Sequence, residues 1–357
     1  MSQIKSVFGG YADKMQIVVN KAKDKFALPW WKAYFDWSPP QTSLTFSQVI
    51  GRSRIEAAAS IVHQNSAAPL RGRATLEKLS GEIPAISQKF QMNGSDYRDF
   101  LALQNMPGVD ESAKINQLLE YLFGDIKKAG EAPHKRLDIM ALEALSKGKM
   151  TITYTNNPDG IVTDDLDLLL PADSFADSET SWGNIAAKPL TVDIPNMVTK
   201  ATERGITLSK ILMSPVLWSK FINITEVKNF IGINKNNNNK VLVTLDNVNS
   251  LLTANMFPAI EIVDVPVGVE KDGKIIVTRP FDNDAATFVP AGKLGTIKNA
   301  IAIEQMQPVK QVNYATFDRV LISKWSQNDP FLEMTKCELN AIPAPDAEFF
   351  ILKAVHA

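Results

Sequence analysis

Cysteine, histidine and long apolar runs are all scarce in this chain of 357 residues. The single cysteine, Cys337, excludes an internal disulfide and fits a reducing compartment. No run approaches the roughly 18 apolar residues that a membrane helix needs, and the first residues lack the apolar core of a secretory signal. The sequence therefore predicts a soluble protein, without a membrane anchor, that is made in a cytosol and stays or assembles there.

A basic excess is also missing. Lysine and arginine number 38 against 39 aspartates and glutamates, which gives a net charge of −1. Nucleic-acid-binding proteins normally carry a basic excess, so we expect no global attraction to DNA or RNA. At this length the chain holds one large domain or two modest ones, each with its own core.

Residues that carry chemistry are few. The three histidines, His63, His134 and His356, show no metal-ligand spacing and are expected to be surface or packing residues. No nucleophile elbow and no phosphate-binding loop occurs, and Gly292–Thr296 has the spacing of a turn. The sequence therefore predicts no catalytic residues, no metal site, no cofactor and no enzyme activity.

What is present is a long amphipathic helix that leads into a hairpin. Apolar residues recur at helical spacing over 115–126 and 137–145, and Gly130 and Pro133 are expected to interrupt the helix between them. Gly148 sits where a helix C-terminus favours a left-handed residue, and a strand begins at Met150. A helix laid across a hairpin is a frame rather than an active site.

A dense aromatic group precedes Pro39-Pro40 and consists of Trp30, Trp31, Tyr34, Phe35 and Trp37. Membrane belts, base-stacking platforms and interface anchors all use such residues. Because no basic groove accompanies the group, we expect an anchor, either on the subunit's own body or on a neighbour.

Residues 51–105 show no clear long period, which is suspicious for a segment inside a compact domain. We interpret them as a hairpin arm that packs on another molecule. Arg71, Arg73 and Lys78 of this arm are predicted to reach an acidic stretch of an adjacent subunit, since complementary charges set register; a solvated arm is the open alternative. The acidic residues are Asp164, Asp165 and Asp167, which lack calcium-loop spacing. Asp165 and Asp167 alternate with leucines, as expected on the solvent-exposed face of a strand.

Three stretches together resemble the lambda-type major capsid proteins of tailed double-stranded DNA bacteriophages. They are Phe26–Trp31, Ile211–Pro215 followed by Trp218, and Ser323–Pro330 followed by Ala341–Pro345. Phe288–Pro290 adds a weaker match. Each motif is loose, but their order spans nearly the whole chain.

The resemblance implies an α+β, Hong Kong 97-like phage capsid fold. It divides the chain into an N-terminal arm at 1–40, a peripheral strand at 41–50, an extended hairpin loop at 51–105, a peripheral domain at 106–187 with a spine helix at 110–147, an axial domain at 188–318, and return strands to the peripheral domain at 319–357.

The resemblance also implies the partners. The chain would form hexamers and pentamers of an icosahedral shell in the virion, made in the bacterial host cytoplasm, that encloses DNA without sequence-specific binding. A separate scaffolding protein, a portal and a decoration protein would accompany it. The alternatives are a cellular nanocompartment shell of the same fold, an α/β enzyme and a host-binding module of a virion.

Overall fold

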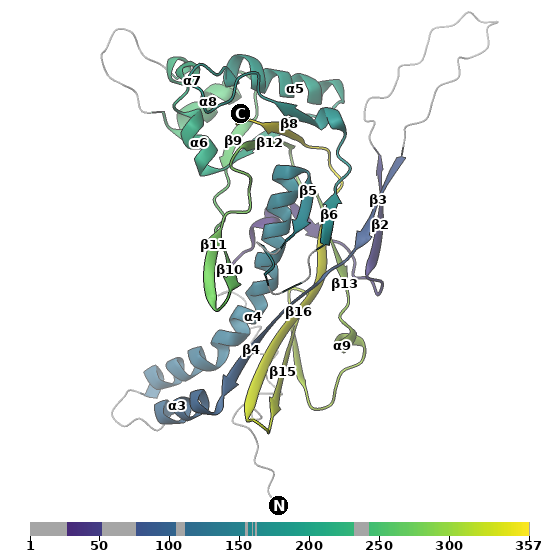
Figure 1. The fold of residues 1–357 in the computed structure, drawn as a ribbon, viewed down its shortest axis with the longest axis vertical. Helices are drawn as coiled ribbons and strands as arrows, with labels where there is room; N and C mark the ends of the chain where they lie inside the picture. The colour runs from purple at the N-terminus through teal and green to yellow at the C-terminus, as the bar shows by residue number, and fades with distance from the viewer. Residues whose placement is uncertain are drawn as a thin grey trace, which may run out of the picture.

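The computed structural model describes residues 27–51, 76–104, 111–153, 156–158, 160, 163–231 and 243–356. These residues form two sheets that are joined by one long helix (Figure 1). The mixture of helices and sheets is the α+β class that the sequence predicted.

The long helix, α4, runs from Glu111 to Lys147 without interruption. The predicted break at Gly130 and Pro133 is therefore wrong. A proline inside a helix costs about 3 kcal/mol. The buried side chains of Leu137, Leu142 and Leu145 contribute about 1.5–3 kcal/mol each, so packing outweighs that cost. The left-handed Gly148 (φ 69°) ends the helix as predicted.

The first sheet has six strands in the order β1-β13-β16-β15-β14, with β4 also paired to β16. Its strands are β1 (Phe35–Trp37), β4 (Ala85–Asn93), β13 (Gly295–Ala300), β14 (Asn313–Phe317), β15 (Val320–Gln327) and β16 (Leu332–Pro345). Helix α4 packs on β16, β4 and β15, and α3 (Gly94–Gln104) packs on α4 and β4. A core centred on Phe35, Leu145 and Ile322 lies between them.

The second sheet has five strands in the order β7-β17-β12-β8-β9. They are β7 (Phe175–Asp177), β8 (Leu208–Met213), β9 (Ala259–Ile262), β12 (Ala285–Pro290) and β17 (Phe350–Lys353). A second core forms here with α5 (Ile194–Glu203), α6 (Pro215–Phe221), α7 (Thr225–Phe230) and α8 (Leu245–Ala254). Ser214 caps α6: its Oγ accepts a hydrogen bond from the Leu217 amide (3.1 Å).

Three two-stranded ribbons pair with neither of these sheets. They are β2 (Thr45–Gly51) with β3 (Leu76–Glu82), β5 (Lys149–Ile152) with β6 (Thr163–Asp167), and β10 (Val267–Lys271) with β11 (Lys274–Thr278). The β2–β3 ribbon stands away from the body on one flank, whereas β10–β11 lies beside α4 on the other (Figure 1). The remaining short helices are η2 (Trp30–Ala33), η3 (Ala172–Ser174), η4 (Pro189–Asp193) and α9 (Ile303–Met306).

Sheet membership differs from the ranges predicted for the domains. Strand β7 lies in the predicted peripheral range, yet it belongs to the five-stranded sheet. Strands β13 and β14 lie in the predicted axial range, yet they belong to the six-stranded sheet, and the C-terminal β17 pairs with β12 rather than returning to the first sheet. Periodicity reveals a strand but not its partner, because strand pairing here joins residues far apart in sequence.

The range predicted for the extended loop, 51–105, also differs from the observed structure. Strand β4 pairs along β16 from Ala85↔Asn340 to Asn93↔Leu332, so this part of the range lies on the subunit's own body. Only the β2–β3 ribbon has the form of an arm in the part of the chain that the structure describes. Residues 52–75, with Arg71 and Arg73, lie outside the described residues.

Candidate assembly surfaces

The N-terminal aromatic group is attached mainly to the subunit's own body. Trp31 is 1% exposed, and its backbone N–H donates to Asp138 Oδ1 on α4 (2.8 Å). Its ring lies edge-on to Trp37, with centroids 4.9 Å apart. Of the two tryptophans predicted as subunit contacts, Trp31 is therefore a core residue. Trp30 is half-buried and packs on Tyr34 (5.1 Å between ring centroids), so part of it remains accessible.

His134 lies inside this aromatic group at 4% exposure. Its ring stacks on Trp31 (5.9 Å) and meets Phe317 edge-on (6.1 Å), and its Nε2 is 3.4 Å from Asp318 Oδ2. Burial lowers the pKa of His134 to about 4, although the Asp318 carboxylate opposes that shift. His134 is thus a packing residue, as predicted; no pattern in the sequence placed it among these aromatic rings.

Asp138 and Asp318 connect the aromatic group to α4 and to the β14–β15 turn. Burial raises the pKa of Asp138 to about 6, although the hydrogen bond from the Trp31 amide opposes the shift. Asp318 Oδ2 forms an ion pair with Lys32 Nζ (2.6 Å), and its Oδ1 accepts from Trp37 Nε1 (3.0 Å). Burial raises and these partners lower the pKa of Asp318, and the net result is a lowered pKa. The charges hold the N-terminal segment on the body; they do not converge on a substrate site.

The β2–β3 ribbon is anchored at its base and exposed along its length. Phe46 and Leu79 are buried at 4% and 2% exposure, whereas Val49 is 60% exposed. Lys78, predicted as a subunit contact, is exposed on β3. The base of the ribbon approaches β6, since a Cβ placed on Gly81 would be 3.3 Å from Leu166 Cδ1.

The acidic strand β6 carries the other predicted contacts. Asp167 is exposed, and its Oδ1 accepts a hydrogen bond from the Leu169 amide (2.8 Å). The backbone of Asp164 and Asp165 belongs to β6, and their side chains lie outside what the structure describes. A contact between this strand and the arm of a neighbouring subunit therefore remains a prediction.

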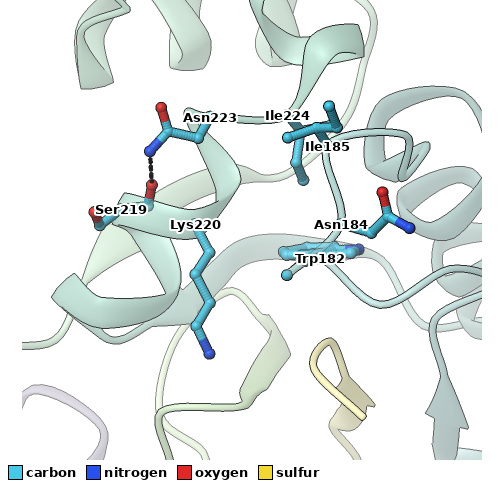
Figure 2. A pocket seen from close by; sticks show the side chains of 8 residues that line it. Trp182, Asn184, Ile185, Ser219, Lys220, Asn223 and Ile224 are labelled. Atoms are coloured by element: carbon cyan, nitrogen blue, oxygen red, sulfur yellow. Dashed lines mark hydrogen bonds between the residues drawn. The ribbon is translucent and has the colours of Figure 1, made fainter. Parts of the chain in front are cut away.

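A cavity of about 210 Å³ lies where the segment at Trp182 meets α6 (Figure 2). Its polar groups have partners within the chain: Lys220 pairs with Asp284 (3.2 Å), and Asn223 Nδ2 donates to the Ser219 carbonyl (2.8 Å). Trp182 and Ile185 supply the apolar wall. The ring Nε1 of Trp182 donates a hydrogen bond to Asp193 Oδ2 (2.7 Å). No nucleophile and base meet here.

Two further features bear on function. Among the described residues, no group of three or more histidine, cysteine, aspartate or glutamate side chains is placed to hold a metal ion. In the same part of the chain, no helix has the length and apolarity that crossing a membrane requires.

A family model described as phage major capsid protein E matches residues 18–354 of the chain. No curated protein sequence matches this chain. The fold is similar to that of a prophage protein of Escherichia coli CFT073 described as a capsid protein, with 13% identity, a TM-score of 0.59 and coverage of 96% of this chain and 98% of that chain.

Two other solved structures are similar at lower scores. A phage-related protein of Bordetella bronchiseptica RB50 has 10% identity and a TM-score of 0.48, covering 95% of this chain and 96% of that one. The mature capsid subunit of bacteriophage PhiM1 has 10% identity and a TM-score of 0.45, with coverage of 92% and 87%.

Proposed function

We propose that this chain, which belongs to the phage major capsid protein E family, builds its shell from hexamers and pentamers of itself. Membership makes the protein a major capsid protein, a structural subunit of the virion shell with the Hong Kong 97-like fold. The observation that carries this conclusion is the family match over residues 18–354.

In the proposed subunit, the six-stranded sheet with α4 is the peripheral domain, and the five-stranded sheet with α5–α8 is the axial domain at the capsomer centre. The two sheets are held together by α4, since Thr287 Oγ1 of β12 donates to the Leu145 carbonyl (2.9 Å). The β2–β3 ribbon is the arm that reaches a neighbour. An arm held only at its base gains its remaining burial from another copy.

We further propose that complementary charges align the arm on the neighbouring subunit. Lys78, with Arg71 and Arg73, would face Asp164, Asp165 and Asp167 of the adjacent subunit. Supporting this, Lys78 and Asp167 are exposed on separate ribbons of one subunit. Such pairs at a solvated rim contribute little affinity but select the correct alignment.

The remaining proposals concern partners. A separate scaffolding protein, a portal and a decoration protein would complete the particle, and synthesis would take place in the cytoplasm of a bacterial host. The net charge of −1 fits a wall that encloses double-stranded DNA without binding it in a sequence-specific way. No observation favours the nanocompartment, enzyme or host-binding alternatives.

The test of shell formation is the state of the purified chain. The protein, expressed in bacteria, is examined by sedimentation velocity and electron microscopy over a range of concentrations. We expect hexameric rings, sheets or closed shells. A compact monomer or trimer at every concentration, with or without phage scaffolding protein, would contradict the proposal.

The arm contact is tested by charge reversal. Lys78→Glu combined with Arg71→Glu and Arg73→Glu should reduce the assembled fraction, and raised salt should reduce that fraction in the unmodified chain. Lys89→Glu reverses the charge of an exposed lysine on β4, outside the proposed contact, and serves as the control. Unchanged assembly of the triple variant would remove the arm contact but leave shell formation intact.

A further inference from the structure

Strand β11 of the β10–β11 ribbon exposes an apolar surface. Ile275, Val277 and Ile276 are 74%, 63% and 50% exposed. Three consecutive β-branched apolar residues that are each at least half exposed are unusual, because such segments pair readily with other chains.

The register of the ribbon separates its two faces. Val267 pairs with Thr278 and Val269 with Ile276, and residues directly opposite each other point to the same face. Val267 and Val269 are buried against Ile139 of α4, so this face is the inner one. Ile275 and Val277 therefore lie on the outer face.

The outer face is flat as well as apolar. Gly268 is paired with Val277, and a Cβ placed on Gly268 would be 2.8 Å from Ile275 Cγ2. The absent side chain lets Ile275 lie down across β10. The result is an apolar surface formed by Ile275, Gly268 and Val277, which we name the β11 face; the exposed Glu270, paired with Ile275, borders it on the same side.

Two of the usual protections of a free strand, a bulge and a proline, are missing from this ribbon. In the described chain β10 and β11 pair only with each other, and their register contains no bulge. The sequence from Lys274 to Thr278 contains no proline, and its charged residue stands at the end next to the turn. Exposed apolar strand surfaces of this kind mark places where another chain binds.

The charges at the tip indicate which chain that is. Glu270 and Asp272 are matched by Lys271 and Lys274, so the rim of the face has no net charge. DNA would require a basic excess there, whereas a copy of this near-neutral chain fits a balanced rim. The ribbon also lies on the flank opposite the β2–β3 arm (Figure 1), and closed rings join two different surfaces on opposite flanks.

We propose that the β11 face, centred on Ile275 and Val277, is a contact between neighbouring subunits, covered by a second copy of this chain. The inference rests on the proposed assembly into a shell and adds a contact that does not involve the arm.

The experiment compares assembly of the unmodified chain with that of the variant Ile275→Thr/Val277→Thr. Threonine keeps the branched Cβ and the strand preference, so the subunit should keep its circular dichroism spectrum and unfolding midpoint. At the concentration where half of the unmodified chain is assembled, we expect at least a tenfold smaller assembled fraction. Ile303→Thr, which alters a 70% exposed isoleucine on α9, is the matched control and should assemble normally.

The outcomes separate the two proposals. If the unmodified chain never assembles, shell formation itself fails. If it assembles and the double variant assembles equally well, only the β11 contact is overturned.

A second measurement tests the proposal even if the double threonine variant fails to fold. Ile275→Cys places an accessible thiol in a chain whose one natural cysteine, Cys337, is buried. Maleimide should label this thiol at least tenfold more slowly in shells of the purified chain than in dissociated subunits. Equal rates would overturn the proposal. Protection seen only after a decoration or scaffolding protein is added would assign the face to that protein and overturn the proposal too.

Discussion

At the residue scale, Asp138 and His134, two ionisable groups beside Trp31, make contributions to the stability of the fold that change with pH in opposite directions. The folded-state pKa of Asp138, about 6, lies above its ordinary value of 3.8, so this group stabilises the fold below pH 4 and loses that contribution as pH rises through 6. The folded-state pKa of His134, about 4, lies below 6.5, so its contribution is lost as pH falls from 6.5 to 4.

Asp138→Asn separates the two effects. The amide oxygen can still accept from the Trp31 N–H, but the group no longer titrates. As pH falls from 7 to 4.5, the unmodified protein should therefore gain about 2 kcal/mol of unfolding free energy relative to the variant. Urea unfolding at a series of pH values measures this, with Asp246→Asn, an exposed carboxylate on α8, as control. Parallel pH curves for variant and unmodified protein would contradict the prediction.

Local residue signals were predictable, and the aromatic group around His134 was not. The capping serine Ser214 and the left-handed Gly148 follow from contacts within a few residues, so sequence alone identifies them. The surroundings of His134 combine Trp31, Phe317 and Asp318, which are far from it in sequence and meet only after both ends of the chain have packed on α4.

At the element scale, the turn between β14 and β15 holds the N-terminal segment. Its two residues, Asp318 and Arg319, have φ values of 43° and 69°, the left-handed geometry in which tight hairpins favour Asn-Gly. Such residues cost about 1–3 kcal/mol each. The Arg319 guanidinium offsets part of this, since it lies over the Trp37 ring (4.9 Å) and donates to the Ser38 carbonyl.

Arg319→Gly should relax the turn and release the segment it holds. We expect faster hydrogen exchange at the amides of Ser38 and Gln41, which donate to the carbonyls of Ile297 and Asn299, and no acceleration across β14–β15. Asp272→Gly, at another left-handed residue (φ 52°), relieves the same kind of strain without touching the N-terminal segment. Equal exchange at Ser38 in both variants would rule out a clamping role for Arg319.

Elements were predicted better than their interruptions. The helical periodicity of 115–126 and 137–145 identified α4, but the local cost of Pro133 suggested a break that does not exist. Tertiary burial decides such cases, and its size cannot be obtained from neighbouring residues alone.

At the scale of the whole molecule, two sheets share one helix, and two ribbons project on opposite flanks. The family and the fold class were predictable because ordered motifs span the chain. The allocation of strands was not, because β17 near the C-terminus crosses to the sheet that contains β8 and β12.

Assembly should raise the thermal stability of the subunit. Contacts that exist only in the shell stabilise the folded chain, by about 2.7 kcal/mol at a hundredfold excess over the dissociation constant. This predicts an unfolding temperature roughly 4 °C higher for shells than for dissociated subunits. Calorimetry of both forms measures it, with re-dissociated shells as control, and one midpoint shared by both forms would contradict it.

The unbroken α4 also has a mechanical consequence. Its 37 residues, about 55 Å measured along the helix axis, contact strands of both sheets. Any shift of this helix would therefore be passed to both sheets together, so that subunits at positions of different curvature would change shape as one connected body.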